Sequence, residues 1–363
     1  MGFSLGIVGL PNVGKSTLFN AITRCAAQAS NYPFCTIDPN IGLVSVPDDR
    51  LEKLTQFSQS KKTIPTAIEF VDIAGLVKGA SKGEGLGNQF LGTIREVKAL
   101  VHVVRCFEDS GIIHVNGQVN PREDIEIINV ELILADLSTL EKRISSTKRG
   151  KDKESVLQNG AYEKIKQALD CGNPARTALL SEQEHMAVRD LNLITQKPVL
   201  YVANISENDM GKMKDNPLIL AVKTIADIEN TQVIEISSRL EEEISQLSTE
   251  EAADFLRELG LEESGLAKLA RASYQLLGLL TYFTSGETET RAWTIKKGTK
   301  APQAAGIIHT DFEKGFIKAE VIGCEELLKA GSYMKAREQG VWRLEGKDYV
   351  MKDGDVVEFK FNP

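Results

Sequence analysis

The chain has 363 residues, of which 42% are hydrophobic and 26% are charged, and its formal net charge is −8 at pH 7. This composition excludes a disordered or fibrous polypeptide and predicts a sizeable core divided into two or three units. The acidic balance argues against a protein that coats nucleic acid over its whole surface, although local basic faces remain open.

The five cysteines are scattered without C-x-x-C spacing, which argues against a zinc site and a disulfide framework and fits a reducing cytoplasm. No apolar stretch reaches the roughly 18 residues of a membrane span, and no basic region precedes an apolar core at the N-terminus. We therefore expect a cytoplasmic monomer without a membrane partner.

The first predicted element is a buried strand over the apolar residues 3–10. It leads into Gly9-Leu-Pro-Asn-Val-Gly-Lys-Ser-Thr17, which matches the phosphate-binding pattern G-x-x-x-x-G-K-[S/T], and residues 17–23 follow as a helix. The two glycines let backbone amides turn toward phosphate oxygens, Lys15 places a charge near the terminal phosphates, and Ser16 is left to hold Mg²⁺. These features predict a site for a nucleoside triphosphate.

The second phosphate motif is Asp72-Ile-Ala-Gly75, which ends a predicted strand over residues 67–72. Asp72 is expected to hold Mg²⁺ through a water, and Gly75 to bring its amide against the γ-phosphate. Thr36 lies between the two motifs, where switch NTPases complete the magnesium shell. This combination favours a P-loop switch NTPase over a kinase or a motor.

Hydrolysis is predicted to be slow, because Leu76 stands where many GTPases carry a glutamine that orients the attacking water. Another group, a monovalent cation or a partner would have to complete the site. His114, in the loop of residues 111–117, is a candidate base or water-positioning group, and its alternative is a structural loop histidine. Asn12 is a candidate ligand of K⁺ near the phosphates.

Further strand-like runs at residues 99–105, 198–204 and 232–237 alternate with helical stretches, which predicts an α/β fold with a doubly wound, mostly parallel sheet. The interval between the first two runs is too long for a simple crossover. Within it, steps of three and four residues form an apolar seam that predicts an inserted coiled-coil arm: Val130, Ile133, Leu137, Leu140 and Ile144. The basic turn at residues 148–153 is either a solvated tip or a contact to RNA.

The pattern changes near Gly278 from helical to β-rich, which predicts a small C-terminal α+β domain. We therefore assign residues 1–128 and 190–277 to the P-loop NTPase domain, residues 129–189 to the helical arm and residues 278–362 to the C-terminal domain.

Base recognition departs from that of GTPases at Asn204-Ile-Ser-Glu207, which follows the fourth predicted strand. The usual motif there is N-K-x-D, whose aspartate accepts the N1–H and N2–H donors of guanine. Both the lysine and the aspartate are missing, so guanine specificity is predicted to be weakened, while a preference for adenine does not follow from this alone. Ser237 and its neighbours are expected to line the base through backbone amides.

Together the motifs resemble those of the YchF family of Obg-related P-loop NTPases over nearly the whole chain. They are residues 9–16, 31–39, 72–79, 83–87 and 204–207. The resemblance implies an Obg-type G domain that is interrupted by a coiled-coil arm and followed by a TGS domain, a β-grasp module, at residues 278–362. It also implies magnesium-dependent hydrolysis of ATP rather than GTP.

The resemblance implies roles for individual residues as well. It assigns the phosphates to Asn12, Val13, Gly14, Lys15, Ser16 and Thr17. It assigns Mg²⁺ to Ser16 and Thr36, adenine to the backbone of Ile205, and a suspected catalytic role to His114.

The resemblance further implies an association with the ribosome, with its large subunit or with RNA, in translation or stress response. Four lysines are candidate RNA contacts: Lys296, Lys297, Lys300 and Lys314. The leading hypothesis is a nucleotide-controlled ATPase switch. The alternatives are an Obg-like GTPase of ribosome assembly, which Asn204 to Glu207 argue against, and an RNA- or protein-binding scaffold in which ATP is a structural ligand.

Overall fold

The computed structural model describes residues 3–28, 40–73, 86–146, 153–210 and 216–362. The chain divides into two compact units. Unit 1 comprises Met1–Gln28, Ile37–Leu43 and Glu69–Ala272, and unit 2 comprises Ala29–Thr36, Val44–Ile68 and Ser273–Pro363.

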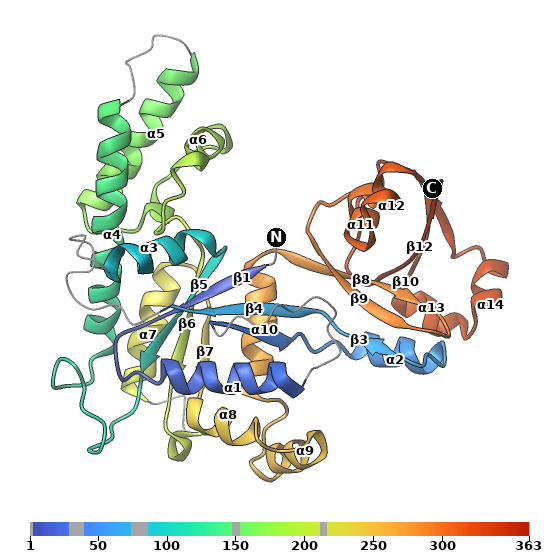
Figure 1. Cartoon of the computed structure of the whole chain (residues 1–363), viewed down its shortest axis with the longest axis horizontal. Helices are drawn as coiled ribbons and strands as arrows, with labels where there is room; N and C mark the ends of the chain where they lie inside the picture. The colour runs from blue at the N-terminus through green and yellow to red at the C-terminus, as the bar shows by residue number, and fades with distance from the viewer. Residues whose placement is uncertain (1–2, 29–39, 74–85, 147–152, 211–215, 363) are drawn as a thin grey trace. The chain divides into compact units, whose positions relative to one another are not determined.

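Unit 1 is built on a six-stranded sheet with the strand order β2-β4-β1-β5-β6-β7. The strands are β1 (Ser4–Val8), β2 (Ile41–Ser45), β4 (Ala67–Asp72), β5 (Ala99–Arg105), β6 (Val199–Asn204) and β7 (Val233–Ile236). β1 pairs in parallel with β4 and β5, and β6 pairs in parallel with β5 and β7. Every residue of β5 and β6 is buried, because helices cover both faces of the sheet (Figure 1). The predicted doubly wound α/β fold is confirmed.

The helices of unit 1 connect these strands and form the inserted arm. They are α1 (Lys15–Gln28), α3 (Leu86–Glu96), α4 (Pro121–Ser146), α5 (Lys153–Asp170), α6 (Glu182–Val188), α7 (Pro217–Ile228), α8 (Ser238–Ile244), α9 (Thr249–Glu258) and α10 (Gly265–Leu276). Three 3₁₀ turns accompany them: η2 (Ala175–Thr177), η3 (Arg189–Leu191) and η4 (Glu207–Asp209). Among the residues described, no helix has both the length and the apolar character that crossing a membrane requires.

The arm is formed by the second half of α4, by α5 running back along it, and by α6 with the turns η2 and η3 (Figure 1). Ile133 and Leu140 of the predicted seam are buried in its core with Tyr162 and Ile165 of α5. The two ends of the predicted seam are not buried, since Val130 is 50% exposed and Ile144 is 39% exposed. The core also takes in α6, η2 and η3, so the arm is a small helical subdomain rather than a bare two-helix coil.

Asp136 anchors the arm to the sheet from inside the fold. Its side chain is fully buried, and its carboxylate accepts hydrogen bonds from the amides of Ile194 and Thr195 at 2.9 and 2.7 Å and from the Thr195 hydroxyl at 2.7 Å. These two residues lie just before β6. A side chain in the middle of α4 therefore fixes the segment that leads into the strand carrying Asn204.

Unit 2 contains a second six-stranded sheet with the order β11-β10-β12-β8-β9-β3. Its strands are β3 (Thr63–Ile64), β8 (Leu279–Ser285), β9 (Thr290–Lys296), β10 (Phe316–Gly323), β11 (Arg343–Glu345) and β12 (Asp355–Phe361). Its helices are α2 (Asp49–Phe57), α11 (Ala301–Ile308), α12 (Thr310–Lys314), α13 (Cys324–Ala330) and α14 (Tyr333–Glu338). The predicted α+β domain is present, and β8 begins one residue after Gly278.

The α2 helix and the β3 strand lie within residues 1–128, which the sequence analysis assigned to the NTPase domain. The structure places them in unit 2, where β3 pairs in parallel with β9. Leu51 and Leu54 of α2 are buried in the same cluster as Phe283 of β8 and Leu327 of α13. Their helical spacing predicts an amphipathic helix but does not reveal which of two sheets it covers.

We predict that Asp136→Ala lowers the free energy of unfolding by about 3 kcal/mol, because it leaves two buried amides and one buried hydroxyl without an acceptor. Urea denaturation followed by circular dichroism measures this loss. Glu141→Ala, an exposed acidic position on the same helix, is the control and should change the free energy by less than about 0.5 kcal/mol. Equal effects for the two variants would contradict the anchoring role of Asp136.

Candidate functional site

The phosphate-binding loop connects β1 to α1, and its glycines are required by close contacts. A Cβ atom on Gly9 would lie 2.6 Å from the carbonyl oxygen of Val103. Gly14 has a φ of 92°, and a Cβ there would lie 2.1 Å from Asn204 Nδ2. Asn12 adopts a left-handed φ of 62°, which asparagine tolerates better than most residues. The loop thus has the tight backbone that the motif predicts.

Lys15 and Asp72 form a partly buried pair of opposite charges at this loop. Burial lowers the pKa of Lys15, and the nearby Asp72 carboxylate opposes that shift. Burial likewise raises the pKa of Asp72, with Lys15 opposing. The Oδ1 atom of Asp72 is buried and has no hydrogen-bond partner among the described residues. A buried carboxylate oxygen without a partner is an oxygen ligand of the kind that Mg²⁺ prefers, and the hydroxyl-bearing Ser16, which follows Lys15, is exposed.

A cavity of about 940 Å³ opens at the phosphate-binding loop, which is large enough for a nucleotide. Three other segments of unit 1 line it together with the loop. They are the loop after β5 (Phe107, Glu108, Asp109 and Ile112), the end of β6 and its continuation (residues 204–208), and the start of α8 (Ser237, Ser238, Arg239 and Glu242). The sheet thus gathers the predicted phosphate and base segments around one cavity.

Asn204 joins these segments through its side-chain amide, which is almost completely buried. Its Nδ2 donates a hydrogen bond to the carbonyl of Val13 at 2.8 Å, and its Oδ1 accepts one from the amide of Ser238 at 2.9 Å. Both ends of the amide are therefore engaged within the protein. The side chain positions the phosphate-binding loop against the start of α8.

The other predicted base-site residues are also held by the fold. The hydroxyl of Ser237 caps α8 by accepting from the amide of Leu240 at 3.4 Å. The amide of Ile205 donates to the carbonyl of Ile236, so a backbone contact from Ile205 to a base would have to use its carbonyl. The Glu207 carboxylate lies 3.2 Å from Nε of Arg239. This carboxylate is thus engaged in an ion pair at the rim of the cavity.

Arg105 is a residue of the site that the sequence analysis missed. It is 1% exposed, and its guanidinium donates to the carbonyls of Phe107, Asp109 and Ile112 at 3.1, 3.3 and 3.1 Å. The guanidinium also lies over the Phe107 ring, 4.6 Å from its centroid. Arg105 therefore holds the loop after β5 in its folded shape. An arginine at the end of a strand with only one other polar residue, His102, was the signal that could have revealed it.

His114 is buried beside Asp124 of α4, and both of its ring nitrogens are engaged. Nδ1 accepts from the amide of Asn116 at 3.2 Å, so Nε2 carries the proton and donates to Asp124 Oδ2 at 3.0 Å. Burial raises the pKa of Asp124, and the bond to His114 opposes that shift. His114 is not among the residues that line the cavity. It would have to leave Asp124 to reach a bound nucleotide.

The loop of His114 is tied to the phosphate-binding loop as well. Nδ2 of Asn12 donates to the carbonyl of Ile113 at 3.1 Å. Asn12 therefore holds the neighbour of His114 in this structure. Three residues of the predicted site, Thr36, Gly75 and Leu76, lie outside the described residues.

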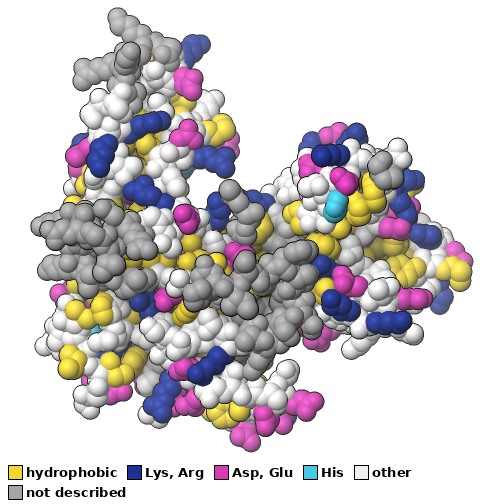
Figure 2. Space-filling view, in the orientation of Figure 1, with side chains coloured by type: hydrophobic (Ala, Val, Ile, Leu, Met, Phe, Trp, Pro, Cys, Tyr) yellow, Lys and Arg dark blue, Asp and Glu magenta, His cyan; other side chains and the backbone are white. Residues whose placement is uncertain are grey.

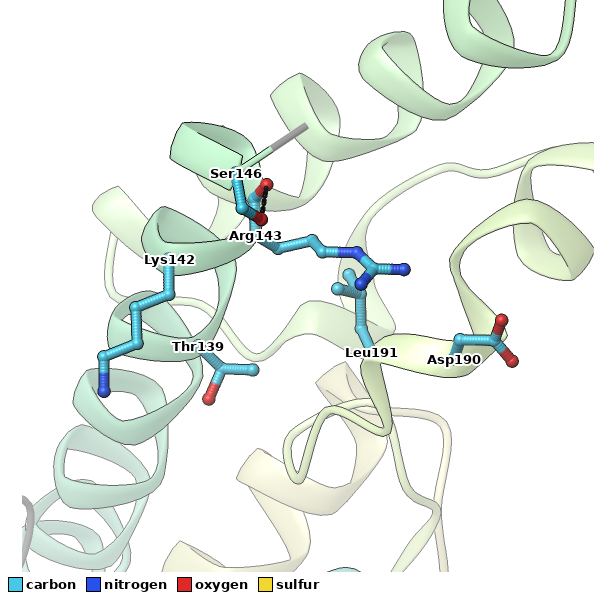
Figure 3. A pocket seen from close by; sticks show the side chains of 6 residues that line it. All are labelled: Thr139, Lys142, Arg143, Ser146, Asp190 and Leu191. Atoms are coloured by element: carbon cyan, nitrogen blue, oxygen red, sulfur yellow. Dashed lines mark hydrogen bonds between the residues drawn. The ribbon is translucent and has the colours of Figure 1, made fainter. Parts of the chain in front are cut away.

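A second cavity of about 290 Å³ lies on the arm, between the end of α4 and η3 (Figure 3). It is lined by Thr139, Lys142, Arg143, Ser146, Asp190 and Leu191. Arg143 extends across toward Leu191, whereas Lys142 points away in the opposite direction (Figure 3). Figure 2 shows basic and acidic side chains intermixed on this part of the surface. The predicted basic turn lies outside the described residues except for Lys153, the first residue of α5.

The four candidate RNA-contact lysines are exposed side chains of unit 2. Lys300 pairs with Asp348 at 2.7 Å, while Lys314 lies at the end of α12. Lys296 ends β9, and Lys297 follows in the next turn. The structure therefore leaves these positions accessible to an anionic partner.

Two family models match the chain. Residues 4–135 match MMR_HSR1, described as a 50S ribosome-binding GTPase, and residues 279–362 match YchF-GTPase_C, described as a protein of unknown function. The chain is 56% identical to the Ribosome-binding ATPase YchF of Bacillus subtilis and 52% identical to that of Escherichia coli O157:H7, with 100% of both chains covered in each case. The structure of the Schizosaccharomyces pombe YchF GTPase matches with a TM-score of 0.89 and 40% identity, over 99% of this chain and 98% of that one.

We predict that Asn204→Ala weakens the binding of a nucleoside triphosphate about tenfold or more, because it frees the carbonyl of Val13 and the amide of Ser238 and loosens two walls of the cavity. Fluorescence titration with a labelled nucleotide measures this change. Gln196→Ala, at a surface position outside the cavity, is the control and should bind as the unmodified protein does. Unchanged affinity in Asn204→Ala would remove Asn204 from the site.

Proposed function

The chain belongs to the YchF family of P-loop NTPases, and from this membership we propose that it is a magnesium-dependent ATPase whose bound nucleotide controls its binding to the ribosome. The relatives named ribosome-binding ATPases are similar along its full length. The chemistry is hydrolysis of ATP to ADP and phosphate. The biological output is the change in conformation that accompanies it.

The observation that favours ATP over GTP is the replacement of both guanine-reading residues at the cavity, since Ile205 and Glu207 stand in place of the lysine and the aspartate. Guanine is read by an aspartate that accepts two N–H donors, whereas the side chain of Glu207 is one methylene longer and its Oε1 lies 3.2 Å from Nε of Arg239. Ile205 stands where a GTPase has the lysine that stacks on the base. Since the similar proteins include one named as an ATPase and one named as a GTPase, base preference is the property to test first.

The phosphate end of the cavity supplies the positions for phosphoryl transfer. Backbone amides would contact the phosphates from Val13, Gly14, Ser16 and Thr17. The ammonium of Lys15 would contact them as well, and the bound anion would raise the pKa of Lys15 back toward its ordinary value. Ser16 and Asp72 would hold Mg²⁺, with Thr36 completing its shell and Gly75 contacting the γ-phosphate. The ion, when bound, would neutralise charge on the phosphate oxygens.

Slow turnover without a partner follows from Leu76 together with the engaged position of His114. We keep His114 as the candidate catalytic group, and its activity would require release from Asp124 and Asn116. Asn12 could take part in that release, since a nucleotide or K⁺ that draws its side chain away would free Ile113. A partner that binds the same loop would have the same effect.

The proposed partner is the ribosome, through its large subunit or its RNA. The exposed lysines of unit 2 and the basic residues of the arm are the positions for phosphate contacts. The scaffold alternative, with ATP as a structural ligand, is favoured by one observation, the fully engaged ring of His114. The GTPase alternative is weakened by the replacement of both guanine-reading residues.

We predict at least a tenfold preference for ATP over GTP, equal to about 1.4 kcal/mol. The measurement is a titration of nucleotide-free protein with fluorescent ATP and GTP analogues in Mg²⁺ and K⁺, competed by unlabelled nucleotides. The double variant Ile205→Lys with Glu207→Asp restores the guanine-reading residues and should move the preference toward GTP. Tighter binding of GTP to the unmodified chain would place the protein with the assembly GTPases.

We predict that His114→Ala lowers the hydrolysis rate at least tenfold while the affinity for ATP stays unchanged, because His114 does not line the cavity. Steady-state phosphate release and nucleotide titration measure the two quantities separately. His185→Ala, an exposed histidine on α6, is the matched control. Equal hydrolysis in the two variants would favour the scaffold alternative.

A further inference from the structure

We propose that unit 2 binds an extended polypeptide segment of a partner protein as an added β-strand, in a slot between the β8–β9 hairpin and the second half of β12. This inference concerns a surface apart from the nucleotide cavity. It rests on the pairing of β12, on the side chains around the slot and on their charges.

The first observation is an unpaired strand edge. β12 pairs with β10 along its whole length, from Phe316↔Phe361 to Gly323↔Asp355. With β8 it shares a single registered pair, Val356↔Phe283, and β8 ends two residues later at Ser285. In the part of the chain that the structure describes, residues 358–361 therefore have no registered strand pair on the β8 side. Such an edge offers backbone donors and acceptors to a further strand.

The second observation is a cavity of about 720 Å³ beside this edge, lined from both faces of the sheet. Trp293 and Phe312 belong to the core that α11 covers, whereas Tyr333 and Trp342 belong to the core that α2 and α13 cover. Successive residues of a strand point to opposite faces. A strand in this slot would place alternate side chains against the two aromatic pairs.

The aromatic side chains are held in place before any ligand binds. The indole N–H of Trp293 donates to Thr284, and that of Trp342 donates to Glu320. Phe312 stacks on Phe361 with ring centroids 3.9 Å apart. Figure 2 shows hydrophobic side chains exposed on the surface of unit 2. Rings that are already fixed lose little freedom when a ligand packs on them, which favours binding.

Arginines cover one side of each indole ring. The guanidinium of Arg291 lies 4.0 Å from the ring centroid of Trp293, and that of Arg337 lies 5.4 Å from the ring centroid of Trp342. Because both indole N–H groups are also engaged, the tryptophans offer apolar surface rather than hydrogen bonds. The slot should therefore select aliphatic or aromatic side chains at alternate positions.

The charges around the slot favour a polypeptide over a nucleic acid. Its charged lining residues are Glu289, Arg337 and Glu358, of which Arg337 already pairs with Glu320 at 3.1 Å and Glu358 with Lys360. Phosphate groups need free cations, which this set does not provide. A neutral or basic strand with apolar residues at every second position has the complementary chemistry.

The test selects binders for the intact chain from a displayed library of random seven-residue peptides. The expected result is enrichment of neutral or basic peptides whose apolar residues alternate, with Kd in the micromolar range. N-methylation of alternate amides in an enriched peptide should weaken binding at least tenfold, because it removes strand hydrogen bonds. Failure to enrich such peptides, or binding that N-methylation leaves unchanged, would overturn the proposal.

Variants of residues that line the slot test whether the peptide binds there. Trp342→Ala should weaken the enriched peptide at least tenfold, Trp342→Phe should recover most of that loss, and both should bind ATP normally. Glu358→Lys is the second variant, because its exposed side chain carries little folding risk. It should weaken basic peptides and favour acidic ones. Peptide affinity that is unchanged in all three variants would exclude the slot.

Two further measurements test whether a nucleic acid or a second copy of the chain occupies the slot instead. A single-stranded oligouridylate of 12 nucleotides that binds with the same dependence on Trp342 would show a nucleic-acid site and overturn the proposal. Concentration-dependent dimerisation that Trp342→Ala abolishes would show a second copy of the chain in the slot. Slower amide exchange in β12 on addition of the peptide, with unchanged exchange in α4 of the arm, would support the added strand.

Discussion

The buried amide of Asn204 is the interaction on which the nucleotide site depends. The parallel register of β5 and β6 places Asn204 beside Arg105 at the carboxyl end of the sheet. From there one side chain holds the phosphate-binding loop and the start of α8 together, while the other holds the loop after β5. Both side chains are held in position because β5 and β6 are buried on each face, which leaves Asn204 and Arg105 little room to move.

The charged groups at the phosphate end show why such rigidity matters. Burial lowers the pKa of Lys15 and raises the pKa of Asp72, and each charge opposes the shift of the other. A triphosphate with its metal would supply the missing partners of both groups. The fold thus holds these two poorly solvated charges in place before any ligand binds. This preorganisation favours tight binding of a ligand that carries both an anion for Lys15 and a cation for Asp72.

The sequence was sufficient for elements whose pattern is local. The glycines and lysine of the phosphate-binding loop, the alternation of strands and helices, and the change of pattern at Gly278 all depend on neighbouring residues, and these features are present in the structure. Asn204 could be placed at the base site, but its two hydrogen bonds reach Val13 and Ser238, which are distant in sequence. Arg105 and the pair of His114 with Asp124 depend in the same way on tertiary contacts. The same limit applies to α2, whose buried leucines are evident from periodicity while its partner sheet is not.

The contribution of α2 and β3 to unit 2 has a consequence for the order in which the protein is made. A ribosome synthesises α2 and β3, within residues 49–64, more than 200 residues before β12, the last strand of the unit 2 sheet. Leu51 and Leu54 must therefore remain without their final partners while nearly all of unit 1 emerges and becomes able to fold. The late completion of unit 2 therefore leaves these apolar side chains exposed for most of translation. It also means that the C-terminal sequence, when expressed alone, would lack the helix that covers Phe283 and would expose the edge of β9.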